Sequence, residues 1–288
     1  MNGTAKWTEI LDFPLEGRQS KPRNVGWTMI IDKGLGVATT QELVEIAAPY
    51  IDIWKLGFGT SALYPRPVLE KKLEIIVEAG IHTCPGGTFL EIALLQDKLV
   101  AFLDLAQEMG YTCIEVSDGT IVMDRSVRRK AISLAREKGL QVITELGKKD
   151  PRDQVATAFL IRQGRADLAD GAHKVIIEGR ESGKGIMIYD QQGKLRVGEM
   201  EEIAEGLGDV DRIIWEAPLK SQQQELILRF GPNVNLGNIP PGEVLALEAL
   251  RRGLRGDTLR ACLAKREQAK AAIADQATAE AALVPLQV

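Results

Sequence analysis

The sequence predicts an α/β protein that consists of a single (β/α)8 barrel, a TIM barrel, with an additional helix at its C-terminal end. Eight short runs rich in β-branched residues recur over about 250 residues, and segments with a helical spacing of apolar residues lie between them. A doubly wound sheet is the alternative. It would show a glycine-rich fingerprint after the first strand, where IDKGLGVATT has only two glycines.

The expected strands are short apolar runs, and several of them end in a charged residue or a glycine. In chain order they cover residues 25–32, 50–57, 80–84, 111–119, 140–147, 173–180, 211–218 and 233–238. Because helical segments separate these runs, the strands are expected to lie parallel to one another in one sheet.

The helices are predicted from apolar residues at steps of three and four. The longest such stripe predicts one helix that contains Ile92, Leu95, Leu99, Phe102, Ala106 and Met109. Glycines that would end helices in the left-handed conformation stand before later strands, at Gly80, Gly110, Gly139 and Gly231. The alanine-rich, charged end of the chain predicts an exposed helix and a tail. We therefore expect a barrel domain over 1–255 and a C-terminal helical extension and tail over 256–288.

The composition excludes several classes of protein. The chain has 288 residues, and its 36 lysines and arginines nearly balance its 40 acidic residues, which argues against a nucleic-acid or membrane-surface partner. No apolar run approaches a membrane span and the N-terminus does not resemble a signal peptide, so we expect a cytoplasmic protein. The three cysteines have no CxxC spacing, which indicates reduced residues in packing roles.

Polar residues gather where the expected strands end, which is where barrel active sites form. Three consecutive strands end in VITE, VIIE and IIWE, and this pattern predicts Glu145, Glu178 and Glu216 at comparable heights. Such a ring is costly unless cations balance it, either lysines and arginines or a bound metal. Carboxylate ligands without histidine or cysteine favour Mg²⁺. A salt-bridged plug that only stabilises the barrel is the alternative.

Glycine-rich turns after three strands offer backbone N–H groups to an anion. They are CPGGT, ESGKG and LGN, and Arg180 and Lys184 flank the second of them. His82 and His173 stand at the beginning or middle of strands without a metal or triad spacing, and this position predicts roles in the core or at the bottom of the barrel.

Longer motifs resemble one known family, the phosphosulfolactate synthases (ComA). These motifs are DKG, KLGFGTS, PGGT, EVSDG, TELGKK, IIEGRESGKG, EAPLKSQQ, VNLGNI and LEALRRGLRGDT, and together they cover residues 12–258. The resemblance implies a carbon–sulfur lyase with its active site in the barrel domain. It would use Mg²⁺ to add sulfite to C3 of phosphoenolpyruvate and form (2R)-3-sulfo-2-phospholactate. A homo-oligomer, with a trimer as one form, is also implied.

The resemblance also implies roles for individual residues. Lys149 would be the general acid, with Lys148 as the alternative, and Lys55 is a third catalytic candidate. The metal would be held by Glu115, Asp118, Glu145 and Glu178. Substrate binding is assigned to Arg180, Lys184, Gly183, Gly237, Asn238 and Ser117. The resemblance leaves open whether the product serves coenzyme M synthesis or sulfolactate production.

Two other functions stay open at this stage. A Schiff-base barrel aldolase would use Lys55 or Lys149 as its nucleophile. A non-catalytic relative, like the heat-stress-associated proteins of plants, would be expected to have lost the KLGFGTS and GKK motifs. Both motifs are intact in this chain.

Overall fold

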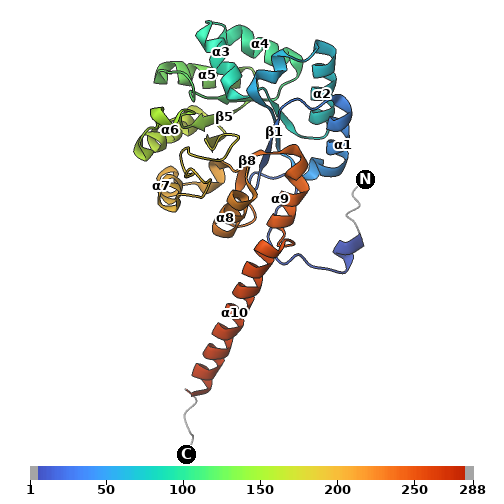
Figure 1. The fold of residues 1–288 in the computed structure, drawn as a ribbon, viewed down its shortest axis with the longest axis vertical. Helices are drawn as coiled ribbons and strands as arrows, with labels where there is room; N and C mark the ends of the chain where they lie inside the picture. Colours follow the sequence, from blue (N-terminus) through green and yellow to red (C-terminus); the bar gives the residue numbers. More distant parts are fainter. Residues whose placement is uncertain (1–5, 283–288) are drawn as a thin grey trace, which may run out of the picture.

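Eight parallel strands form a nearly closed barrel inside a ring of helices, so the predicted fold class is confirmed (Figure 1). The computed structural model describes residues 6–282, and positions 269, 270 and 272–282 only by their backbone. The strands are β1 (Thr28–Asp32), β2 (Ile53–Leu56), β3 (His82–Cys84), β4 (Cys113–Val116), β5 (Gln141–Leu146), β6 (Lys174–Ile177), β7 (Ile213–Glu216) and β8 (Asn235–Ile239). Each overlaps one of the predicted runs.

The barrel has a seam between β3 and β4, because the ladder of strands runs in the order β3-β2-β1-β8-β7-β6-β5-β4. Two threonine side chains bridge this seam. The backbone N–H of Thr83 donates to Oγ1 of Thr112 at 3.0 Å, and the N–H of Thr112 donates to Oγ1 of Thr83 at 3.2 Å. Reciprocal side-chain bonds thus take the place of part of the missing ladder.

The outer helices follow one another around the barrel in chain order (Figure 1). They are α1 (Val37–Ala47), α2 (Arg66–Glu78), α3 (Gly87–Leu95), α4 (Leu99–Met109), α5 (Arg125–Glu137), α6 (Thr157–Asp170), α7 (Val197–Leu207), α8 (Lys220–Phe230) and α9 (Val244–Arg251). Short 3-10 turns precede or join them at Lys6–Glu9, Ala48–Tyr50, Gly57–Ala62, Pro151–Asp153, Val210–Arg212 and Pro241–Glu243. The glycines predicted to end helices all adopt positive φ, with Gly80 at 69°, Gly110 at 94°, Gly139 at 76° and Gly231 at 86°.

The prediction of one helix from Ile92 to Met109 was wrong, because the chain turns between α3 and α4. Asp97 adopts a left-handed φ of 55°, and the N–H of Lys98 donates to the carbonyl of Ala93 at 2.8 Å. This bond spans five residues, as in a Schellman motif that ends a helix. Apolar residues keep their spacing of three and four from α3 into α4, and no glycine marks the break. The apolar pattern alone therefore does not reveal the turn.

Alternation along the strands divides their side chains between two apolar layers. One residue from each of seven strands points into the barrel, where they form a small core with Trp27: Met29, Ile53, Cys84, Cys113, Ile143, Ile176 and Ile214. The neighbouring residues, such as Trp54 and Trp215, belong to the larger core between the strands and the helices. Two residues beyond the inner layer, each strand points into the barrel again, now near its C-terminal end.

The amino-terminal end of the barrel is closed by Trp27. Its ring stacks on His173 at a centroid distance of 5.1 Å, and Nζ of Lys174 lies 4.6 Å from the centre of the same ring. His82 also packs against Trp27, at 6.4 Å. Both histidines therefore lie at the bottom of the barrel, as the sequence predicts.

The additional C-terminal helix is α10 (Gly256–Ala282), which projects from the barrel as a long rod (Figure 1). Its first residue matches the predicted start of the extension, although the division into domains at residue 255 stays a prediction. The last part of the predicted tail, 283–288, lies outside the described residues. None of the helices between residues 6 and 282 is long and apolar enough to cross a membrane.

Candidate active site at the carboxyl ends of the strands

A layer of charged side chains lies directly above the inner apolar layer. Two residues beyond Ile53 stands Lys55, and the same step leads from Cys113 to Glu115, from Ile143 to Glu145, from Ile176 to Glu178 and from Ile214 to Glu216. Because successive inward positions on a strand are two residues apart, all five side chains point into the barrel. They are at most 5% exposed.

Lys55 joins two of these carboxylates. Its Nζ lies 3.1 Å from Oε2 of Glu115 and 3.1 Å from Oε1 of Glu216. The other oxygen of Glu115 accepts the N–H of Gly87 at 2.8 Å, at the first residue of α3. A Cβ at Gly87 would come within 2.6 Å of that oxygen, so this approach requires glycine. The glycine-rich turn predicted to hold an anion thus faces Glu115.

Lys149 joins the other two carboxylates from above. Its Nζ lies 2.6 Å from Oε1 of Glu145 and 2.6 Å from Oε2 of Glu178. The backbone of Lys149 is held in place by its N–H, which donates to the carbonyl of Gly119 at 2.9 Å. Gly147 gives the chain its bend before the lysines, with a φ of 122° that strongly favours glycine.

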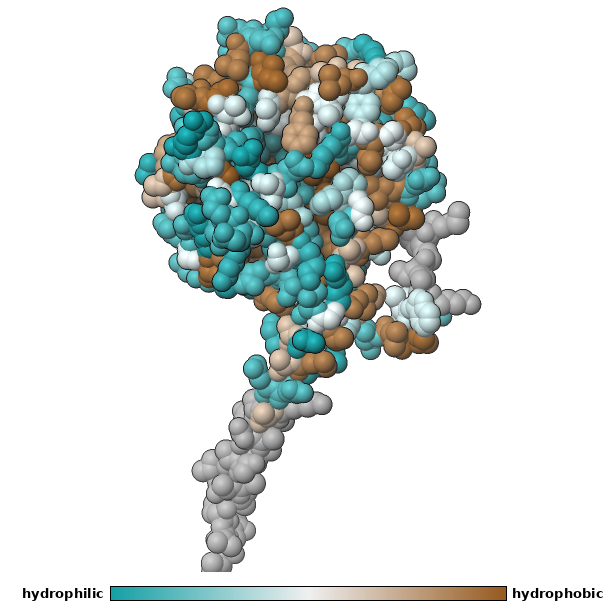
Figure 2. Space-filling view, in the orientation of Figure 1, coloured by the Kyte–Doolittle hydropathy of each residue, from teal (hydrophilic) through white to brown (hydrophobic). Residues whose placement is uncertain are grey.

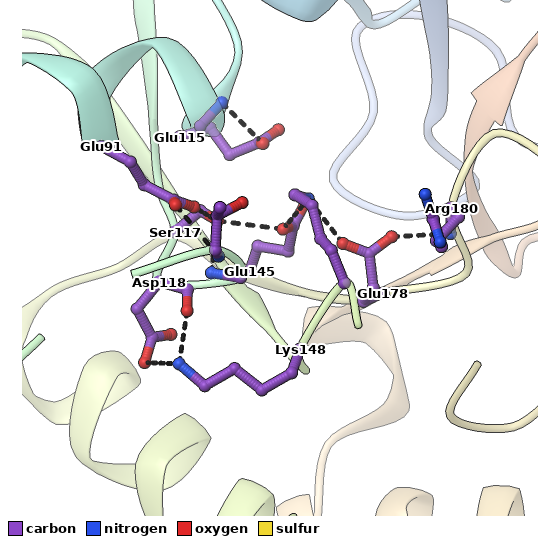
Figure 3. A network of polar contacts seen from close by, with 12 residues as sticks. Glu91, Glu115, Ser117, Asp118, Glu145, Lys148, Glu178 and Arg180 are labelled. Carbon is purple, nitrogen blue, oxygen red and sulfur yellow. Dashed lines mark hydrogen bonds and ion pairs between the residues drawn. The ribbon is translucent and has the colours of Figure 1, made fainter. Parts of the chain in front are cut away.

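Lys148 points away from this cluster. Its Nζ lies 3.0 Å from Oδ2 of Asp118 (Figure 3). It also donates to the carbonyl of Ile121 at 3.0 Å. Arg128 holds the other oxygen of Asp118 at 3.0 Å. The two adjacent lysines therefore do different things, since one orders the loop after β4 and the other enters the barrel.

Glu91 is a buried carboxylate that the sequence did not single out. It lies on α3, is 1% exposed, and accepts the hydroxyl of Ser117 at 2.6 Å and the N–H of Thr120 at 3.0 Å. Ser117 also lies 3.0 Å from Oε1 of Glu145, but its hydroxyl has one proton and donates to one carboxylate at a time (Figure 3). A glutamate within the apolar run TFLEIALL was the available signal.

Burial and mutual repulsion shape the ionisation of the acids. Burial raises the pKa of Glu115 to about 7, against the attraction of Lys55. Burial, with Glu145 and Glu216 as like-charged neighbours, raises the pKa of Glu178 well above its usual value. Glu145 differs, because Lys149 and Lys55 outweigh the effect of burial and lower its pKa to about 2.

The two lysines keep their protons. Burial opposes the charge of Lys55, but Glu115 and Glu216 outweigh it and raise the pKa of the amine. The pKa of Lys149 is raised for the same reason, since Glu145 and Glu178 outweigh the cost of burial. Both side chains are therefore ammonium ions at neutral pH.

Three of the carboxylates could hold a metal ion. One oxygen each from Glu145, Glu178 and Glu216 lies within 4.8 Å of the other two, so the prediction that these residues lie at comparable heights is confirmed. Four buried glutamates share two lysines in this layer, so two negative charges are in excess when all four acids are ionised. A divalent cation bound by oxygen ligands would balance them.

A cavity of about 330 Å³ opens above the charged layer. Asn238 and Arg180 line its wall, and Oδ1 of Asn238 is buried without a hydrogen-bond partner in the part of the chain that the structure describes. Both residues adopt a left-handed backbone, with φ of 54° and 59°. An unpartnered buried acceptor and such backbone strain are typical of ligand sites. The remaining wall includes Ile31, Phe58, Phe89, Glu181 and Ser182.

Comparison with known proteins identifies the family. The sequence model of the (2R)-phospho-3-sulfolactate synthase (ComA) family matches residues 16–257. The chain belongs to this family. It is 45% identical to the phosphosulfolactate synthase of Methanothermobacter thermautotrophicus over 250 residues, which are 86% of this chain and 96% of that protein. With the phosphosulfolactate synthase of Bacillus subtilis the identity is 37%, over 86% and 98% of the two chains.

More distant similarities separate family from fold. Protein HEAT-STRESS-ASSOCIATED 32 of Arabidopsis thaliana is 23% identical over 82% of this chain and 89% of its own. A solved structure of 3-hexulose-6-phosphate synthase shares 16% identity and a TM-score of 0.53, over 78% of this chain and 99% of that one. The similarity to 3-hexulose-6-phosphate synthase concerns the barrel fold alone.

Three residues that the sequence assigned to substrate binding, Lys184, Gly183 and Gly237, do not line the cavity. Lys184 is exposed, and Gly183 is buried against α8, where its carbonyl accepts Nε2 of Gln222 at 2.7 Å. Gly237 pairs with Glu216 across the β7–β8 ladder. A Cβ there would lie 2.8 Å from Cε of Met29 and 3.5 Å from Cγ of Glu216. Gly237 therefore leaves room for the charged layer.

Proposed function

We propose that this protein is a phosphosulfolactate synthase, which adds sulfite to C3 of phosphoenolpyruvate and yields (2R)-3-sulfo-2-phospholactate. The observation that supports this best is the position of Lys149, an ammonium group between two buried carboxylates at the floor of a cavity. Such a group can deliver a proton to a bound substrate. The product would serve coenzyme M synthesis or sulfolactate production.

In the proposed reaction, the lone pair of the sulfite sulfur forms a bond to C3 of phosphoenolpyruvate. The electrons of the C2–C3 double bond move toward C2 and the substrate carboxylate, and Lys149 then gives its proton to C2 while the phosphate ester stays intact. Solvent returns a proton to the amine. Arg180 and Asn238 would bind the substrate on the cavity wall, and Lys55 would keep Glu115 and Glu216 in position.

We propose Mg²⁺ as the metal, with Glu145, Glu178 and Glu216 as the residues that hold it. Their oxygens lie close together, and their hard, anionic character suits this ion. When bound, Mg²⁺ supplies electrostatic stabilisation for the charge that develops on the substrate carboxylate. Glu115 and Asp118 are left out of the proposed set because neither belongs to the group of carboxylate oxygens that lie within 4.8 Å of one another. Asp118 is instead bound by Arg128 and Lys148.

The Schiff-base alternative requires a neutral amine as nucleophile. Lys55 and Lys149 each lie between two carboxylates that keep them protonated, so neither suits that role. A non-catalytic role is also disfavoured, because the charged layer is complete and the synthases share more identity with this chain than the Arabidopsis protein does. Borohydride treatment with substrate should therefore trap no adduct.

We further propose a cytoplasmic homo-oligomer, with a trimer as one form. Large apolar side chains are exposed around the cavity and the neighbouring helices, notably Phe58 at 60%, Leu63 at 80% and Leu95 at 68%. Apolar residues also gather in the region of α3 and α4 in Figure 2. Burial of such a surface between subunits would be favourable. Light scattering that shows only a 31.5 kDa monomer would contradict this proposal.

The direct test is to incubate the purified protein with phosphoenolpyruvate, sulfite and Mg²⁺ and to follow the products by ³¹P NMR. A new phosphate-ester signal that depends on sulfite is the expected result. EDTA should abolish its formation and added Mg²⁺ should restore it. No product under any of these conditions would refute the proposed activity, whereas full activity in EDTA would refute only the metal requirement.

A further inference from the structure

The cavity has few cations that are free to meet anionic substrates. Lys55 and Lys149 are each bound to two carboxylates of the charged layer. Arg180 also lines the cavity and forms no ion pair with any residue that the structure describes. Phosphoenolpyruvate and sulfite together carry several negative charges, so one free guanidinium leaves most of that charge unpaired.

A fourth cation contacts a residue of the cavity wall. Lys33 follows β1 and forms an ion pair with Glu181, which lines the cavity next to Arg180. The pair joins the loops after β1 and β6, which are separated by β8 and β7 in the sheet. It therefore crosses the part of the mouth where Asn238 lies, on the side where many barrels bind phosphate.

The backbone under Lys33 is well held, whereas its side chain is not. Oδ1 of Asp32 accepts the N–H groups of Gly34 and Leu35, both at 2.8 Å, and this fixes the turn after β1. The side chains of Lys33 and Glu181 remain 47% and 48% exposed. An ion pair this exposed contributes little to stability because water screens both charges, so little is lost when the lysine leaves it.

We propose that Lys33 is a substrate-binding residue that exchanges Glu181 for the phosphate group of phosphoenolpyruvate. A phosphate dianion carries more charge than a carboxylate and accepts stronger, charge-assisted hydrogen bonds. Glu181 then keeps the lysine over the cavity until the substrate arrives. This inference rests on the proposed function, and it assigns Lys33 to phosphate recognition together with Arg180.

The experiment measures binding of phosphoenolpyruvate by calorimetry, with Mg²⁺ and without sulfite, so that no reaction occurs. Lys33→Gln should raise the Kd roughly tenfold, as expected for the loss of one charge-assisted contact. Glu181→Gln should lower the Kd about twofold, because the lysine no longer has a competing partner. The double variant should resemble Lys33→Gln. Lys71→Gln and Glu74→Gln alter an exposed ion pair on α2 and serve as matched controls.

Changes of opposite sign in the Kd of the two single variants distinguish this role from a purely structural one. If the ion pair only ties two loops together, both single variants and the double variant should weaken binding equally. That result, or an unchanged Kd for Lys33→Gln, would overturn the inference and leave the proposed function intact. Failure of the wild-type protein to bind phosphoenolpyruvate would instead overturn the proposed function, and the role of Lys33 with it.

Discussion

The two ends of the barrel both bury charged side chains, but they balance them differently. At the amino-terminal end, Arg23 pairs with Asp52 at 2.7 Å and Arg18 pairs with Glu248 at 3.1 Å. Arg251 donates to the carbonyls of Pro232 and Val234 at 2.7 and 2.6 Å. Arg23 and Arg18 are therefore matched by carboxylates, whereas Arg251 has only carbonyl acceptors and its buried Nε has no partner in the described part of the chain.

At the carboxyl-terminal end the balance is incomplete. Four glutamates share two lysines, and the nearby Oδ1 of Asn238 has no partner among residues 6–282. A protein retains such an excess of buried charge only at a cost in stability, so it marks a place where something from solution binds. The comparison teaches that buried charge by itself does not indicate function, whereas a cluster of buried carboxylates that lines a cavity does.

The largest expected effect is on catalysis at the carboxyl-terminal end. Lys149→Ala should lower kcat by about 10²–10⁴-fold, because general acid catalysis typically contributes that much. Lys148→Ala is the matched control, since its amine bonds to Asp118 outside the charged layer, and its kcat should fall far less. Steady-state kinetics on both variants would check this. A nearly normal kcat in Lys149→Ala, or a greater loss in Lys148→Ala, would contradict the assignment.

The next effect concerns stability and should appear at the other end. Asp52→Ala leaves Arg23 buried without its carboxylate, and it removes the acceptor of the N–H of Thr28 at 2.8 Å. We expect a loss of about 3 kcal/mol in the free energy of unfolding, measured with urea. Glu178→Gln, which removes one of four crowded carboxyl groups in the mouth, should cost much less. Equal losses in the two variants would remove the contrast between the two ends.

The affinity for Mg²⁺ tests which carboxylates at the carboxyl-terminal end hold the metal. Glu216→Gln should weaken Mg²⁺ binding on the order of 100-fold, because it removes a proposed ligand. Asp118→Asn should leave the affinity for Mg²⁺ close to that of the wild type, since this carboxylate is already held by Arg128 and Lys148. Calorimetric titration with Mg²⁺ would separate them. Weaker binding in Asp118→Asn alone would restore Asp118 to the ligand set in place of Glu216.

The smallest effect is a pH dependence of stability at the amino-terminal end. Burial, with Lys174 and Arg212 as neighbours, lowers the pKa of His173 to about 4. The unfolded chain therefore binds more protons between about pH 4 and 6.5, and stability should fall as the pH is lowered through that range. After allowance for partial exposure, we expect about 1 kcal/mol. His173→Gln should flatten the unfolding profile there, and an unchanged profile would argue against this histidine.

The sequence by itself determined the barrel, the order of its strands along the chain and the residues at their ends. Three runs end in Glu145, Glu178 and Glu216. In each run the glutamate points to the same side of the sheet as the apolar residue two positions before it, because side chains alternate on a strand with a period of two. The same local rules predicted positive φ at the glycines that end helices. These features depend on neighbours in sequence, which is why a single chain reveals them.

Only the tertiary structure decided which charged groups meet. The pairs Lys55 with Glu216 and Lys33 with Glu181 join residues 161 and 148 positions apart, and no local pattern links them. The bonds of Lys148 and Lys149 likewise depend on where the loop after β4 and the end of β6 lie. Strand order and barrel closure set these distances, and closure is a property of the whole sheet. The division of the glutamates between lysine partners and the proposed metal follows from that geometry.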